Sequence, residues 1–194
     1  MKSSEHGVSI VRHPEVTPDI KGICYGATDV GLSKRGLNSI AGIAEQLSEL
    51  HPTRVYHSGL TRARLLAEGI AAVADCDLIV DVRFQELNFG AWENQSWTAI
   101  FAEVGDEIAR TIHEPDTFAP PGGETVHQLR DRVLAALKDI GSEGHSVIVA
   151  HGGPISTVRG SLAGMPASQW PGLVPACGEA IHLSATDIAT LLGS

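Results

Sequence analysis

Two short runs, each of the kind that forms a buried strand, lead straight into a histidine. The first covers Val8–Arg12 and precedes His13, and the second covers Val147–Ala150 and precedes His151. Nearly continuous apolar runs are typical of strands that are covered on both faces of a sheet. We therefore expect a fold built around a buried sheet that delivers two imidazoles at strand ends.

Strand and helix patterns alternate along most of the chain. Further strands are expected at Arg54–His57, Leu78–Val82 and Ala180–Leu183, and helices at Ser33–Leu50, at Thr61–Ala74, from Gly122 to Ile140 and from about Pro154. The region from Arg83 to Pro121 is less regular, with one or two helices around 97–111. This alternation predicts an α/β fold, a three-layer α/β/α sandwich with a mainly parallel sheet. The length fits a single domain over residues 1–194.

Composition excludes several classes of function. The net charge of −9 argues against nucleic acid and anionic membranes as partners. The chain shows no run long enough for a membrane span and no signal-peptide pattern, so a cytoplasmic location is expected. The cysteines, Cys24, Cys76 and Cys177, are too scattered for a disulfide framework or a zinc site, and Cys24 is expected to be a small, apolar, semi-buried residue. We predict no metal and no cofactor, while the oligomeric state stays open, a dimer included.

Ligands of parallel sheets bind beyond the carboxyl ends of the strands. His13, His151 and Arg62 each follow such an end. The planar guanidinium of arginine can bond two phosphoryl oxygens at once, which makes Arg12 and Arg62 candidate phosphate ligands. A protonated His151 would be a third donor to the same group. These residues predict a pocket for a small phosphorylated substrate.

The attacking group and the proton donor are chosen by elimination. No serine lies in a nucleophile-elbow pattern, and no cysteine lies in a glycine-rich loop flanked by arginine. A neutral imidazole can attack phosphorus directly, and His13 beside Arg12 is the natural choice. Glu86, after the third expected strand, is the candidate acid. Glu93 is its rival, unless it caps the segment that starts near Ser96.

Each of these residues also has an ordinary structural interpretation. A lone strand-end histidine is usually a hydrogen-bonded structural residue, Arg62 could be a solvated arginine in a first helical turn, and Glu86 a surface carboxylate. Glu124 is expected to be a charge in the first turn of a helix. The tryptophans, Trp92, Trp97 and Trp170, are expected to pack in the core or at a rim rather than stack on a substrate.

Taken together, the chain resembles the histidine phosphatase superfamily, also called the phosphoglycerate-mutase-like family. The matching segments, in order, are Val11–Glu15 (similar to Arg-His-Gly-Glu), His57–Ala63 (similar to Ser-Ser-Pro-Leu-x-Arg-Ala), Glu86–Glu93, Pro121–Glu124 and Val149–Gly153. The resemblance implies that His13 is the phosphorylated nucleophile and that Arg12, Arg62 and His151 bind the phosphoryl group. It also favours Glu86 over Glu93 as the acid/base.

The chain departs from the family pattern at Pro14, Val16, Asp19 and Gly59; Val16 stands where a Thr or Ser is common, and Asp19 where some members have an Asn. Pro14 stands where the family has a glycine, which removes a backbone N–H near the phosphate, and Gly59 replaces a proline. The stretch Gly22–Ser33 resembles the alpha-ribazole phosphatase branch, which makes alpha-ribazole 5'-phosphate a candidate substrate and cobalamin biosynthesis a candidate context.

The expected function is a metal-independent histidine acid-type phosphatase, that is, a phosphomonoesterase that works through a phosphohistidine. One alternative is a phosphoglycerate mutase-type phosphotransferase, for which the chain looks short. Another is a non-catalytic phospholigand-binding protein with a degenerate pocket, an interpretation that Pro14 supports. Specificity is expected to lie in 14–31 and 83–121, because members of such folds differ mostly in their loops.

Overall fold

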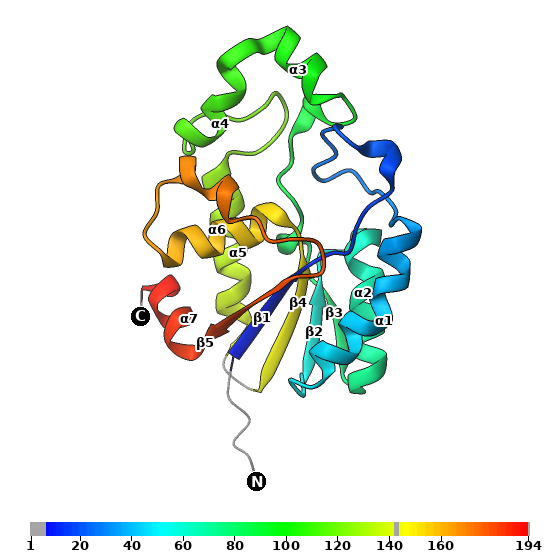
Figure 1. The fold of residues 1–194 in the computed structure, drawn as a ribbon. Helices are drawn as coiled ribbons and strands as arrows, with labels where there is room; N and C mark the ends of the chain where they lie inside the picture. Colours follow the sequence, from blue (N-terminus) through cyan, green and yellow to red (C-terminus); the bar gives the residue numbers. More distant parts are fainter. Residues whose placement is uncertain (1–6, 142–143, 194) are drawn as a thin grey trace.

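The computed structural model describes residues 7–141 and 144–193 (Figure 1). The strands are β1 (Gly7–Arg12), β2 (Arg54–His57), β3 (Asp77–Val80), β4 (His145–Ala150) and β5 (Ala180–Ser184). The α-helices are α1 (Lys34–Ser48), α2 (Thr61–Ala74), α3 (Trp97–Val104), α4 (Arg110–His113), α5 (Val126–Ile140), α6 (Gly152–Leu162) and α7 (Ala185–Leu192). Short 3-10 helices are η1 (Pro18–Ile20), η2 (Val82–Phe84), η3 (Gly90–Trp92), η4 (Gly105–Ala109) and η5 (Ala167–Leu173).

The strands form one sheet in the order β3-β2-β4-β1-β5. Strands β3, β2, β4 and β1 pair in parallel, and β5 lies antiparallel beside β1 at one edge. The register places Arg12 opposite Ala150, so the next residues, His13 and His151, leave neighbouring strands at the same edge of the sheet. The prediction of a mainly parallel sheet is therefore confirmed.

Helices cover both faces of this sheet (Figure 1). Helices α1 and α2 lie on one side, and α5, α6 and α7 lie on the other. Alternate side chains of each central strand point to opposite layers: Val11 and Val149 belong to the core under α1 and α2, whereas Ile10 and Ile148 belong to the core under α5 and α6. Burial of one such side chain contributes roughly 1.5–3 kcal/mol. The predicted three-layer sandwich is confirmed.

Local capping explains why α5 begins later than predicted. The helix expected to open at Gly122 begins at Val126, because Thr125 and Gln128 form a capping box. The Thr125 hydroxyl accepts from the Gln128 N–H at 3.0 Å, and the Gln128 side chain accepts from the Thr125 N–H at 2.8 Å. The expected start at Gly122 was therefore wrong by four residues.

Two other boundaries also differ from the prediction. The strand expected at Leu78–Val82 ends at Val80, because the Asp81 carboxylate accepts from the Arg83 N–H and starts η2. The helix expected from about Pro154 begins at Gly152, directly after β4. This earlier start brings two more backbone N–H groups to the strand end.

The region from Arg83 to Pro121 lies above the carboxyl ends of the strands (Figure 1). It holds α3, η4 and α4, which confirms the expectation of helices around 97–111. Cys24 packs there with Trp92 and Ile100 in a small core of their own. Within 7–141 and 144–193, none of the helices has the length and apolar character that crossing a bilayer requires.

Candidate active site

His13 directly continues β1, and its backbone N–H donates to the Ala150 carbonyl at 3.0 Å. Its side chain is 1% exposed, with Nδ1 2.7 Å from the Pro14 carbonyl oxygen. Because a carbonyl can only accept, Nδ1 carries the ring proton and Nε2 carries the lone pair. Burial lowers the pKa of His13 to about 3; the Pro14 hydrogen bond opposes this effect, and the charges of Arg62 and Arg12 add to it. The imidazole is therefore neutral at neutral pH and is suited to nucleophilic attack.

His151 caps α6 and lies beside His13, with 5.1 Å between the ring centroids. Its Nδ1 accepts from Nε of Arg62 at 3.2 Å, so the ring proton sits on Nε2, which lies 2.8 Å from the Ser58 hydroxyl oxygen. Burial, followed by the charges of His13 and the nearby arginines, lowers the pKa of His151 well below its usual value. The ring is thus neutral, and its N–H points at Ser58. Donation to a phosphoryl oxygen stays a prediction, which requires this N–H to leave Ser58.

Arg62 lies in the first turn of α2 and is fully buried, so the interpretation as a solvated arginine is wrong. Its Nη1 donates to the Thr28 carbonyl at 2.8 Å and its Nη2 to the Gly26 carbonyl at 2.6 Å, and the Tyr25 ring lies 5.1 Å from its guanidinium. With the His151 bond, these partners use three of five N–H groups, and all of them are neutral. The buried charge therefore keeps donors for an anion, which would compensate its desolvation.

Arg12, the last residue of β1, is the second cation at this edge. Its Nη1 donates to the Pro175 carbonyl at 2.7 Å, while its buried Nε has no partner among the described atoms. A buried donor without a partner costs about 1–3 kcal/mol, a cost that an oxyanion would remove. Both predicted arginines thus have capacity to bind phosphoryl oxygens.

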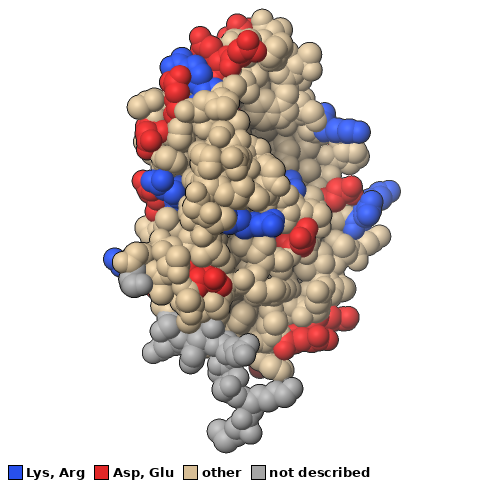
Figure 2. All heavy atoms as spheres, turned by 60° about the vertical axis from the view of Figure 1, so that its left-hand side comes forward, with Lys and Arg blue, Asp and Glu red and all other residues tan. Residues whose placement is uncertain are grey.

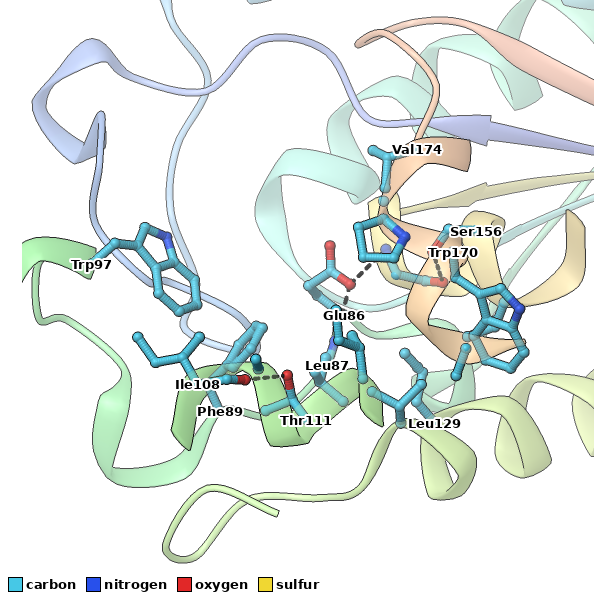
Figure 3. A pocket seen from close by; sticks show the side chains of 18 of the residues that line it. Glu86, Leu87, Phe89, Trp97, Ile108, Thr111, Leu129, Ser156, Trp170 and Val174 are labelled. Atoms are coloured by element: carbon cyan, nitrogen blue, oxygen red, sulfur yellow. Dashed lines mark hydrogen bonds between the residues drawn. The ribbon is translucent and has the colours of Figure 1, made fainter. Parts of the chain in front are cut away.

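Glu86 is held by one carboxylate oxygen only (Figure 3). Oε1 accepts from the backbone N–H groups of Leu87 at 3.0 Å and Gly153 at 2.9 Å, and the other oxygen projects away from these bonds. Gly153 permits this approach, since a Cβ there would lie 2.3 Å from Oε1. Burial raises the pKa of Glu86, although the hydrogen bonds and the charge of Arg62 oppose the shift. A carboxyl group with a raised pKa is suited to donate a proton.

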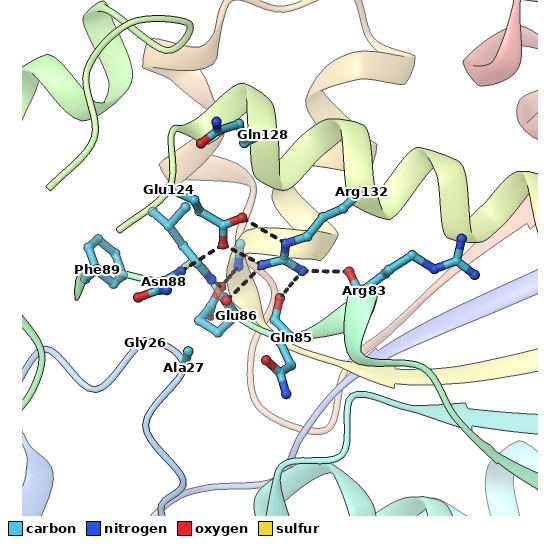
Figure 4. A network of polar contacts seen from close by, with 12 residues as sticks. Gly26, Ala27, Arg83, Gln85, Glu86, Asn88, Phe89, Glu124, Gln128 and Arg132 are labelled. Atoms are coloured by element: carbon cyan, nitrogen blue, oxygen red, sulfur yellow. Dashed lines mark hydrogen bonds and ion pairs between the residues drawn. The ribbon is translucent and has the colours of Figure 1, made fainter. Parts of the chain in front are cut away.

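A paired carboxylate and guanidinium hold the segment that carries Glu86 (Figure 4). Arg132 donates to the carbonyl oxygens of Gln85 at 2.8 Å and Glu86 at 3.0 Å. Glu124 accepts from Nε and Nη2 of Arg132 at 2.9 and 2.7 Å, and from the Asn88 N–H at 2.9 Å. Glu124 precedes α5, so the expected helix-turn role was wrong. The sequence pattern alone did not reveal Arg132, because an arginine within an amphipathic helix is usually a solvated one.

Glu93 has a structural role different from the predicted one. Its oxygens accept from the N–H groups of Ala27 at 2.9 Å, Thr28 at 2.8 Å and Phe89 at 3.1 Å, and from the Thr28 hydroxyl. Ser96 caps α3 with its own hydroxyl, so the expected capping by Glu93 is wrong. Glu93 instead fixes the loop whose carbonyl groups hold the buried arginine of α2.

Two of the departures from the family pattern, Pro14 and Gly59, have visible local consequences. Pro14 is buried, and its carbonyl supplies the acceptor for His13. Gly59 has φ +88°, which a proline cannot adopt, and its N–H donates to Nδ1 of His57 at 3.1 Å. This turn brings Ser58 against the second histidine. Ser58 was missed as a site residue; its place in the segment His57–Ala63 was the only sequence signal for it.

A cavity of about 650 Å³ meets these residues at Arg12, Glu86 and the Gly152–Gly153 backbone. His13 and His151 adjoin these lining residues in the sequence. Figure 3 shows Glu86 between two walls of the cavity, one with Trp97 and the other with Trp170. Burial raises the pKa of the nearby Cys24 thiol to about 12, in keeping with its expected apolar role. The described residues contain no cluster of His, Cys, Asp or Glu that could hold a metal ion.

Comparisons with known proteins identify the family. The model of the histidine phosphatase superfamily (branch 1) matches residues 8–187. The probable phosphoglycerate mutase GpmB of Escherichia coli O1:K1 is 30% identical over 163 residues, which cover 82% of this chain and 76% of that protein. A mycobacterial glucosyl-3-phosphoglycerate phosphatase in complex with VO3 is 26% identical, with a TM-score of 0.80 over 92% of both chains. The alpha-ribazole phosphatase of Shigella flexneri, 22% identical, shares the fold, with a TM-score of 0.78 over 91% of this chain and 89% of that one. The predicted resemblance is thus confirmed, and the chain belongs to the histidine phosphatase superfamily.

Proposed function

We propose that this protein is a phosphomonoesterase that hydrolyses a small phosphate ester through a phosphohistidine at His13. The observation that carries the proposal is the state of His13 itself. Its imidazole is neutral, its Nδ1–H is held by Pro14, and Nε2 makes no hydrogen bond to the described residues. Two arginines with unused donors lie beside it. The similarity to a phosphatase in complex with a vanadium oxyanion also supports the proposed phosphatase function.

In the first step, Nε2 of His13 attacks phosphorus and the bond from phosphorus to the ester oxygen breaks. The electron pair of that bond goes to the leaving oxygen, which takes the carboxyl proton of Glu86. The phosphorylated ring keeps its Nδ1 proton and becomes cationic. The Pro14 carbonyl at 2.7 Å stabilises that proton and the charge.

In the second step, the Glu86 carboxylate takes a proton from water as the water oxygen attacks phosphorus. The bond from nitrogen to phosphorus breaks, and its electron pair returns to Nε2 of His13. The products are inorganic phosphate, a neutral imidazole and a protonated Glu86, so the enzyme returns to its starting state. The proposed cycle uses no metal ion and no cofactor.

Arg12 and Arg62 hold the phosphoryl oxygens through the two steps, with His151 as a further donor. The backbone N–H groups at the start of α6 add a positive dipole end at the same place. Fixed donors of this kind stabilise the charge that develops on the equatorial oxygens. Both arginines are suited to this role, because the hydrogen-bond partners described for each of them are neutral and leave the positive charge for the phosphoryl group.

Two alternatives carry over from the sequence. A phosphoglycerate mutase-type phosphotransferase is favoured by the name of the curated relative GpmB. A non-catalytic phospholigand-binding protein was suggested by Pro14, but the acceptor that Pro14 supplies to His13 argues for a working nucleophile. Alpha-ribazole 5'-phosphate stays a candidate substrate. The proposal also keeps a single domain over 1–194, a small-molecule partner and a cytoplasmic location.

Trapping of the intermediate tests the proposal. A radiolabelled phosphate ester, mixed with the enzyme and quenched in base, should label the wild-type protein but not His13→Ala, which should also lose all phosphate release. His113→Gln is the control, since His113 is an exposed histidine at the end of α4 and has no role in the mechanism. Persistent labelling of His13→Ala would overturn the assignment. Isomerisation of 3-phosphoglycerate without phosphate release would favour the mutase.

A further inference from the structure

We propose that the cavity beside Glu86 binds a large, uncharged and mainly apolar leaving group, so that the natural substrate is the phosphate ester of an apolar alcohol. This inference deepens the proposed phosphatase function and rests on it. It starts from where the cavity lies. Arg12, Glu86 and Gly153 line one part of it, and the ester oxygen has to lie near Glu86 to receive its proton. The group attached to that oxygen therefore extends into the rest of the cavity.

The rest of the cavity wall is mainly apolar and includes four aromatic side chains among the described residues. It combines side chains from the segment between Glu86 and α3, from α3 and η4, and from η5, namely Phe89, Trp97, Phe101, Ile108 and Trp170. Phe89 and Trp97 pack edge to face with 5.3 Å between their ring centroids, which fixes the wall on one side (Figure 3). Such walls bind flat or extended apolar groups through buried area rather than through hydrogen bonds.

Charge in the cavity does not suit an acidic leaving group. Among the described residues that line it, Arg12 is the only Lys or Arg, while Glu86 and Asp106 are acidic. Arg12 is already assigned to the phosphoryl group. The carboxylate of a phosphoglycerate would thus enter a site in which the described lining offers no second cation and includes the acidic Asp106, which is unfavourable. On the face of the molecule that Figure 2 shows, basic and acidic side chains lie in small groups between wide areas of other residues.

Hydroxyl groups in the cavity wall are also occupied. Three lining residues carry one, and each donates to a backbone carbonyl three residues earlier: Thr111 to Ile108 at 2.8 Å, Ser156 to Gly153 at 3.0 Å and Thr157 to Pro154 at 2.8 Å. A sugar would bring several hydroxyl groups into a wall that offers few free donors. Polar groups buried without partners cost free energy, so the wall selects against sugars.

Exposed aromatic side chains on α3 also favour an apolar leaving group. Phe101 is 56% exposed and Trp97 is 36% exposed, although both line the cavity. Large apolar side chains left open at a site rim are a frequent mark of a binding surface. A volume of about 650 Å³ is much more than a three-carbon acid fills, and it matches the range of sites for larger ligands. An apolar alcohol that fills it would cover both rings.

A series of alkyl phosphates tests the inference. Ethyl, butyl, hexyl and octyl phosphate share nearly the same leaving-group chemistry, so differences in kcat/KM report contacts of the chain. We expect kcat/KM to rise up to roughly fourfold for each added methylene until the cavity is filled. Phe101→Ala should lower the octyl-to-ethyl ratio of kcat/KM several-fold. Leu37→Ala is the matched control, because Leu37 is similarly exposed, at 47%, but does not line the cavity.

The outcomes separate this inference from the function on which it rests. If kcat/KM is the same for all the alkyl phosphates while turnover still depends on His13, the inference of an apolar leaving group is overturned and the phosphatase function is supported. A preference for 3-phosphoglycerate or glucose phosphate over octyl phosphate also overturns it. If no ester is turned over, the phosphatase proposal fails. Calorimetry then compares the affinities of octylphosphonate and ethylphosphonate, which tests whether the cavity binds an apolar group. Tighter binding of octylphosphonate, weakened by Phe101→Ala, then supports the inference, and equal binding overturns it.

Discussion

The ring nitrogen Nδ1 of His13 lies 2.7 Å from the carbonyl oxygen of Pro14, the next residue along the chain. This contact fixes the tautomer in which Nε2 has the lone pair, and in the proposed mechanism it stabilises the cation that forms after phosphorylation. Every residue type has a backbone carbonyl, so the proline at this position removes an N–H without removing the acceptor. The departure from the family's glycine is therefore compatible with a working nucleophile.

Replacement of Pro14 tests this argument. Pro14→Ala keeps the carbonyl and frees φ in the unfolded chain, so we expect kcat within a few-fold of the wild type. The free energy of unfolding should fall by about 0.4–1 kcal/mol, because proline restricts the unfolded state. Steady-state kinetics and urea unfolding measure the two effects. A hundredfold loss of kcat in a folded Pro14→Ala protein would show that the ring needs more than the carbonyl.

The protonation of Glu86 predicts the pH dependence of turnover. The first step needs its carboxyl form, and burial raises its pKa above the ordinary 4.5. Activity should thus fall as pH rises through this raised pKa, whereas His13, with a pKa of about 3, stays neutral and does not limit the rate on the acid side until far lower pH. The pH profile of kcat/KM for an alkyl phosphate measures this alkaline limb.

Glu86→Gln provides the matching test. It has no proton to donate, so turnover of an alkyl phosphate should drop by roughly 10²–10⁴-fold. Turnover of p-nitrophenyl phosphate should drop far less, because that leaving group needs little protonation. The part of the alkaline limb that belongs to Glu86 should disappear as well. Equal slowing of both substrates would place the acid elsewhere.

The bonds that Arg132 makes to the segment of Glu86 predict a positioning effect. Arg132→Lys cannot reproduce the paired bonds to Glu124 and to the carbonyl groups of 85 and 86. We expect kcat to fall on the order of 10- to 100-fold with little change in KM, and the Glu86-dependent alkaline limb to shift. Arg130→Lys is the control on the same helix: among the described residues Arg130 pairs with the exposed Asp131, and its replacement should change neither quantity. An unshifted limb in Arg132→Lys would argue for a purely structural role.

Much of the architecture followed from local patterns. The sequence predicted β1, β4 and α1 correctly, because the spacing of their apolar residues matches the faces that the fold buries. The ends of β3 and α5 were not, since single side chains set them: Asp81 caps η2, and Thr125 forms a capping box. Such caps compete with other polar residues nearby, so pattern alone leaves a few residues of uncertainty.

Some residues of the site could likewise be predicted from the sequence and others could not. His13, His151 and Arg62 were brought together by a topological rule, because parallel strands end at one edge. Arg132 and the pairing of Ser58 with His151 depend on contacts between residues more than 40 positions apart. No periodicity encodes such contacts. The apolar cavity likewise arises only when α3, η4 and η5 assemble, so the leaving group could not be inferred from any one segment.

Among the described residues, the buried histidines His13, His57 and His151 also predict an acid-sensitive fold, because burial lowers the pKa of each. His13 is neutral in the folded protein with a pKa of about 3, whereas an unfolded histidine has its usual 6.5. Between these values the unfolded chain binds more protons, so the stability that is present above about pH 6.5 is lost as pH falls toward about 3. His151 acts in the same direction, because burial lowers its pKa as well.

Urea unfolding across this range measures the effect. The free energy of unfolding of the wild type should drop by on the order of a few kcal/mol toward the acid end. His13→Gln should show a shallower loss, because the protonation step of His13 is absent while those of His57 and His151 remain. His113→Gln removes an exposed imidazole instead and serves as the control. If His13→Gln lost stability with acid as steeply as the control, the buried His13 would not be the group that links folding to pH.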